Sequence, residues 1–67
     1  MSRAYGIRFD GRLTEEGRHA FCDMKIVDIP PGTLLYGEVI DESHLHGIIA
    51  QLRAMGITIT SVHPVLP

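Results

Sequence analysis

The sequence predicts a small α+β domain in which an antiparallel sheet packs against two helices. Three observations lead to this prediction: apolar residues alternate with period two near the N-terminus, recur at helical spacing between residues 42 and 55, and are β-branched in the segment 57–62. The chain has 67 residues, 45% of them hydrophobic, and contains no internal repeat or interior linker. We therefore expect one domain spanning residues 1–67.

The first part of the chain predicts a strand followed by a short helix. The apolar residues that alternate along this strand are Tyr5, Ile7 and Phe9. Thr14 offers an N-cap hydroxyl before two acidic residues, which favour the positive end of a helix dipole. We expect a short helix over residues 15–22, although Gly17 weakens it, and a third strand in this segment is the alternative.

The middle of the chain predicts a β-hairpin. Residues 24–29 and 33–40 are rich in β-branched and aromatic residues, and Pro30-Pro31-Gly32 separates them. Prolines cannot donate to a strand ladder, and Gly32 is expected to supply a permissive backbone where the chain reverses.

The C-terminal part predicts a longer helix and a last strand. Asp41 is a good N-cap for a helix over residues 42–55, and Gly56 stands where a C-terminal glycine cap is expected. The apolar residues of this helix recur at helical spacing and are Leu45, Ile48, Ile49 and Leu52. The β-rich segment 57–62 is predicted to be the final strand.

The predicted element order is strand, helix, strand, strand, helix, strand. With two helices on one face of an antiparallel sheet, this order predicts a ferredoxin-like plait, βαββαβ. If the first helix does not form, the order becomes three strands, a helix and a strand, βββαβ, which is still α+β.

Part of the C-terminal half resembles a known family. Residues 37–47 read GEVIDESHLHG, residues 52–56 read LRAMG, and Ser61-Val62 follows. This pattern, D-x-x-x-L-H-G followed by L-R-x-x-G and S-V, is similar to that of a family of short uncharacterised bacterial proteins. The resemblance implies a stand-alone fold, and it implies no activity and no site residues because the family has no assigned function.

Size and charge narrow the classes of function. A single core of this size supplies only about 3–5 kcal/mol, and the lone Cys22 excludes an internal disulfide, so we expect self-association. The formal net charge is −2 and the six basic residues are scattered, which argues against binding to nucleic acid. The sequence has no long apolar run and no signal peptide, so we expect a cytoplasmic protein without a membrane segment.

The candidate catalytic and metal-binding residues have structural explanations. His44 and His46 are two apart, and on a helix they point away from each other, so we expect no shared metal ion; Gly47 is expected to admit a close neighbour. Cys22 and His19 are spaced to meet on a helix, but no orienting residue accompanies them. We predict no catalytic residues, no metal and no cofactor.

The sequence predicts an interaction surface more specifically than it predicts any catalytic or metal site. If Leu35 and Val39 face the helices, then alternate residues of the same strand form a partly apolar outer face. The C-terminus is apolar and contains two prolines, and we expect it to pack either against its own domain or against a partner subunit. The predicted interaction residues are Leu34, Tyr36, Glu38, Ile40, Val65 and Leu66.

We therefore expect a non-enzymatic interaction module, accessory or regulatory, that acts as a homo-oligomer and has an unidentified protein as another possible partner. The alternative is a small-ligand sensor that resembles amino-acid-binding regulatory domains, with its ligand held between subunits near residues 10–14. A third class is a small enzyme with its site at a dimer interface, which would require the histidines and Cys22 to converge. Fold alone does not decide among these classes.

Overall fold

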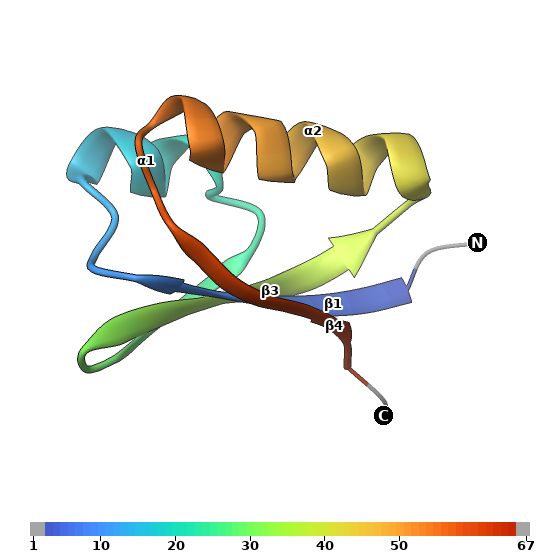
Figure 1. The fold of residues 1–67 in the computed structure, drawn as a ribbon. Helices are drawn as coiled ribbons and strands as arrows, with labels where there is room; N and C mark the ends of the chain where they lie inside the picture. Colours follow the sequence, from blue (N-terminus) through green and yellow to red (C-terminus); the bar gives the residue numbers. More distant parts are fainter. Residues whose placement is uncertain (1–2, 66–67) are drawn as a thin grey trace.

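The computed structural model describes residues 3–65 and has an α+β fold, as predicted (Figure 1). Its elements follow one another as strand, helix, strand, strand, helix, strand. They are β1 (Arg3–Asp10), α1 (Glu15–Ala20), β2 (Lys25–Ile29), β3 (Gly32–Val39), α2 (Glu42–Ala54) and β4 (Ile59–Pro64). The alternative with a third strand in place of α1 is wrong, because residues 15–20 are helical.

The four strands form one antiparallel sheet in the order β2-β3-β1-β4. The two longest strands, β1 and β3, lie at the centre and pair along their whole length, from Arg3 opposite Val39 to Asp10 opposite Gly32. Each helix connects two strands that have one other strand between them. Both helices consequently lie over the same face of the sheet, and within residues 3–65 no helix lies over the opposite face (Figure 1).

The hydrophobic core lies between the sheet and the two helices. Its buried side chains come from β1, β3, α2 and the segments on either side of α1, and are Ile7, Phe9, Leu13, Phe21, Met24, Leu35, Val39, Ile48 and Leu52. The alternation predicted for β1 is confirmed, since Ile7 and Phe9 are almost completely buried while Arg8 and Asp10 are exposed.

Gly32 is required in the hairpin for a different reason than the predicted one. Ile29 pairs with Gly32 across the two-residue turn Pro30-Pro31, whose peptide bond is cis. Gly32 does not have a positive φ, so it is not required for an unusual backbone conformation. Instead, a Cβ atom at this position would overlap the carbonyl oxygen of Phe9 on the neighbouring strand.

The predicted caps of α2 are confirmed. The Asp41 carboxylate accepts a hydrogen bond of 2.8 Å from the backbone N–H of His44. At the other end, Gly56 has a φ of 77° and donates to Arg53, and Ile57 donates to Leu52. This pair of backbone bonds is a Schellman motif, which leaves Ile57 in the helix terminus and delays the start of β4 to Ile59.

Candidate functional site

The candidate site is the face of the sheet that no helix covers, which we call the outer face. Residues opposite one another on antiparallel strands point to the same face. Val27, Leu34, Arg8 and Ser61 therefore form one row across the outer face. A second row consists of Lys25, Tyr36, Gly6 and His63.

The apolar part of the outer face lies on the hairpin. Leu34 and Tyr36 of β3 are half-buried, and Val27 of β2 is 40% exposed although it is a large apolar residue. The Lys25 ammonium lies 5.9 Å from the centre of the Tyr36 ring, a cation–π distance. The outer face thus has an apolar centre next to charged groups.

Gly6 shapes the other half of the outer face. A Cβ atom at this position would come within 3.2 Å of His63 Nε2 and 3.3 Å of Val65 Cγ2. The side chains of these two residues therefore lean across β1 above the glycine. Val65 is fixed there by its backbone N–H, which donates to the Ala4 carbonyl oxygen at 2.8 Å.

Most of the predicted interaction residues lie on the outer face. Leu34, Tyr36 and Glu38 are there by their register, and Val65 lies beside them over β1. Ile40 is elsewhere: β3 ends at Val39, and Ile40, 65% exposed, lines a cavity of about 260 Å³ with residues of the helix-covered side such as Leu45. Leu66 lies outside the described residues.

The sequence reasoning missed Val27, Lys25, Arg8 and His63 on the same face. A signal for the first two was available. A two-residue turn makes the residues that flank it a pair, so Ile29 stands opposite Gly32, Val27 opposite Leu34 and Lys25 opposite Tyr36. The positions of Arg8 and His63 depend on the pairing of β1 with strands far away in the sequence, which no local pattern indicates.

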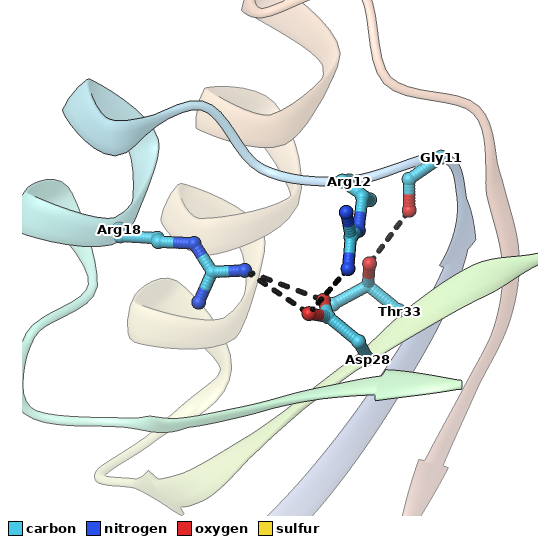
Figure 2. A network of polar contacts seen from close by, with 5 residues as sticks. All are labelled: Gly11, Arg12, Arg18, Asp28 and Thr33. Atoms are coloured by element: carbon cyan, nitrogen blue, oxygen red, sulfur yellow. Dashed lines mark hydrogen bonds and ion pairs between the residues drawn. The ribbon is translucent and has the colours of Figure 1, made fainter. Parts of the chain in front are cut away.

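A polar network ties the loop after β1 to the hairpin (Figure 2). The Asp28 carboxylate accepts hydrogen bonds from Arg12 at 3.2 Å and from Arg18 at 3.3 Å. The Thr33 hydroxyl, which is buried, donates to the Gly11 carbonyl oxygen at 2.6 Å. Asp28 and Thr33 are opposite one another and point to the helix side, so this network is not part of the outer face.

The histidines and Cys22 are dispersed. α1 ends at Ala20, so Cys22 lies beyond the helix and the helical spacing that would bring it to His19 does not apply. His44 has a structural role that was not predicted, because its Nδ1 accepts a hydrogen bond of 3.1 Å from the Ile40 N–H in front of α2. Among residues 3–65, no three His, Cys, Asp or Glu side chains are grouped so that they could hold a metal ion.

Two further expectations concern close packing and membrane segments. Gly47 does not admit a close neighbour, because no atom outside its own helix backbone and its two chain neighbours lies within 4 Å of where its Cβ would be, so that prediction is wrong. In the described part of the chain, no helix has the length and apolar character needed to cross a membrane.

The fold and this face define a class: a small α+β domain with a four-stranded antiparallel sheet that has both helices on one side. The chain belongs to a family described as a domain of unknown function (DUF8691), whose sequence model matches residues 4–63. The expectation of an uncharacterised family is thereby confirmed. Neither a curated protein nor a solved structure matches the chain.

Proposed function

We propose that this chain is a non-enzymatic interaction module that self-associates through its outer face and serves as an accessory or regulatory subunit in the cytoplasm. We further propose that its fold is the ferredoxin-like plait. One observation carries the proposal: both helices lie on one side of the sheet (Figure 1), so no helix among residues 3–65 covers Val27, Leu34 and Tyr36, which the strand register places on the other side.

The size of the outer face fits a partner of similar size. A standard interface takes about 800 Å² from each partner, which is roughly a sixth of the 4659 Å² of accessible surface of this chain. The molecule measures 30 × 22 × 19 Å. One of its broad faces has a comparable share of the surface, so a dimer would use most of the area around Val27, Leu34 and Tyr36.

The chemistry of the outer face favours a second copy as the occupant. Lys25 is basic and lies opposite Tyr36, and Glu38 is acidic and follows Tyr36 on the same face of β3, so both signs of charge stand beside the apolar centre formed by Leu34 and Tyr36. A surface that has both signs of charge around an apolar centre can be complementary to itself, as a two-fold symmetric interface requires. A thin core gives the chain a thermodynamic reason to associate, because binding stabilises the folded state.

Other functions receive less support from the same residues. Arg12 and Arg18 already share the Asp28 carboxylate, and the remaining basic residues form no cluster that would follow a phosphate backbone. A catalytic site from His19 and Cys22 would need a helix that extends past Ala20.

The test is the solution mass of the chain, measured by light scattering over a concentration series. We expect a dimer or larger assembly at high concentration. The variant Tyr36→Lys puts a second ammonium group beside Lys25 at the centre of the face, so it should shift the dissociation constant upward by at least tenfold, about 1.4 kcal/mol.

The matched control is Ala50→Lys, because Ala50 is an exposed residue of α2 on the other side of the molecule. It introduces the same charge and should leave the dissociation constant unchanged. Circular dichroism checks that both variants are folded. A parent protein that is monomeric at all concentrations, or equal effects of the two variants, would overturn the proposal.

A further inference from the structure

A cavity of about 200 Å³ opens at the hairpin end of the outer face. Charged, hydroxyl-bearing and apolar residues all contribute to its lining. It is lined by Arg8, Phe9, Asp10, Ile29, Pro31, Gly32, Thr33, Thr60 and Ser61. The cavity is formed by a single chain, so binding there does not require self-association.

A β-bulge brings two hydroxyl residues to this cavity. Arg8 pairs with Ser61 and Phe9 pairs with Ile59, so Thr60 is an extra residue in β4. Bulges redirect side chains and are frequent beside functional sites. Here Thr60 and Ser61, which would point to opposite faces of a regular strand, both line the cavity beside Arg8.

The cavity has a basic and an acidic group that do not neutralise each other by contact. Arg8 and Asp10 are two residues apart on β1, so they point to the same face with their Cα atoms about 6.6 Å apart. Within residues 3–65, neither the Arg8 guanidinium nor the Asp10 carboxylate forms a hydrogen bond or an ion pair. Each is therefore available to a ligand.

We propose that this cavity binds a small zwitterion of the α-amino-acid class. The carboxylate of the ligand would accept hydrogen bonds from the Arg8 guanidinium and from the hydroxyls of Thr60 and Ser61. Its ammonium group would pair with Asp10. A guanidinium forms charge-assisted bonds to a carboxylate, and a carboxylate side chain is the matching acceptor for an ammonium group.

The size and the apolar wall limit the ligand. At about 30 Å³ per water in the liquid, the cavity has room for roughly six or seven water molecules, which is enough for an amino acid as small as alanine or serine. Ile29 and Pro31 form the apolar side against which a short aliphatic side chain would lie. A nucleotide or a peptide would extend out of this cavity into solvent, so it could place only a part of itself against these groups.

The test is thermal unfolding of the full chain in increasing concentrations of L-alanine, with acetate and methylammonium as singly charged probes. We expect a saturable rise of Tm with alanine, because a ligand that binds only the folded state stabilises it by mass action. Acetate and methylammonium each use only half of the site, so each should produce less than a third of that rise.

Two variants and a control identify the site. Arg8→Gln and Asp10→Asn should each abolish the saturable rise, and Arg53→Gln on the exposed surface of α2 should retain it. A rise that persists in both site variants is the nonspecific effect of an excluded cosolute, and it would overturn the proposal. An equal rise with acetate would also overturn it, since the site would then bind any small anion.

If Arg8→Gln does not fold, amide chemical shifts of the parent protein, measured by NMR, test the same site. During titration with alanine, the changes should be confined to β1 residues 8–10, the hairpin turn and Thr60-Ser61. Changes centred on the cavity at Ile40 and Leu45 instead would place binding at the other end of the sheet and contradict the inference.

Discussion

Single glycine residues of this chain differ in what an added methyl group would meet. At Gly32 a Cβ atom would overlap the backbone of Phe9, which cannot move without disturbing the pairing of β1 with β3. At Gly47, inside α2, a Cβ atom would meet nothing within 4 Å. Close packing therefore requires a glycine at position 32, whereas the space beside Gly47 would accommodate a methyl group.

The substitution of each glycine by alanine should have opposite effects. Gly32→Ala should destabilise the chain by about 1–3 kcal/mol, because the backbone must shift to accept the methyl group. Gly47→Ala should stabilise it by about 0.5–1 kcal/mol, since alanine is the better helix former. Urea denaturation of both variants measures the two free energies of unfolding, and the pair has the same chemical change, so each serves as control for the other.

At the scale of elements, α2 is defined by its ends. Two side chains bond to backbone N–H groups at its start: Asp41 accepts from His44, and His44 accepts from Ile40. This arrangement is similar to a capping box with a histidine in place of the usual Glu or Gln, except that His44 accepts from Ile40, the residue before the N-cap, and not from Asp41 itself. The helix begins where it does because these two bonds satisfy backbone donors around its first turn.

Removal of the Asp41 cap should destabilise the chain by about 0.5–2 kcal/mol. Asp41→Ala leaves the His44 N–H without its acceptor, whereas Asp41→Asn keeps a side-chain oxygen there and should retain most of the stability. Chemical denaturation followed by circular dichroism compares the two variants. Equal losses for alanine and asparagine would mean that charge, and not the hydrogen bond, stabilises this end of α2.

Element boundaries were predictable where a local signal sets them. Thr14 caps α1 and Asp41 caps α2, and both were identified from the sequence because capping needs only a side-chain oxygen within a few residues of the N–H groups. The start of β4 was predicted two residues too early. Ile57 is β-branched, but its N–H belongs to the helix terminus, where it donates to Leu52.

At the scale of the whole molecule, stability depends on one small core. Leu52 of α2 is completely buried among residues from β1 and β3, including Ile7 and Leu35. A chain of this length has only about 3–5 kcal/mol of stability from such a core. The free energy lost when one large core side chain is truncated is therefore comparable with the total free energy of unfolding.

Leu52→Ala should cost about 2–5 kcal/mol and leave much of the protein unfolded at 25 °C. Ile40→Ala is the control, since it removes a large apolar side chain that is 65% exposed and should change stability by no more than about 0.5 kcal/mol. Thermal unfolding monitored by circular dichroism distinguishes the two. A cooperative transition in Leu52→Ala close to that of the parent would show that the core tolerates the cavity.

Local sequence patterns were sufficient for the features that act over a few residues. Period-two alternation in β1, helical spacing in α2 and the caps at Thr14, Asp41 and Gly56 all depend on backbone geometry that repeats within one or two turns. Together with the chain length, they predicted the α+β class and the order of the elements.

Outside the hairpin, the neighbours of each residue across the sheet became known only from the folded chain. The pairing of Arg8 with Leu34, and the approach of His63 and Val65 over Gly6, arise because strands distant in sequence pair in one register. The bulge that brings Thr60 to the cavity has the same origin. Register is set by burying one face of every strand at once, and that is a property of the whole core, not of any local pattern.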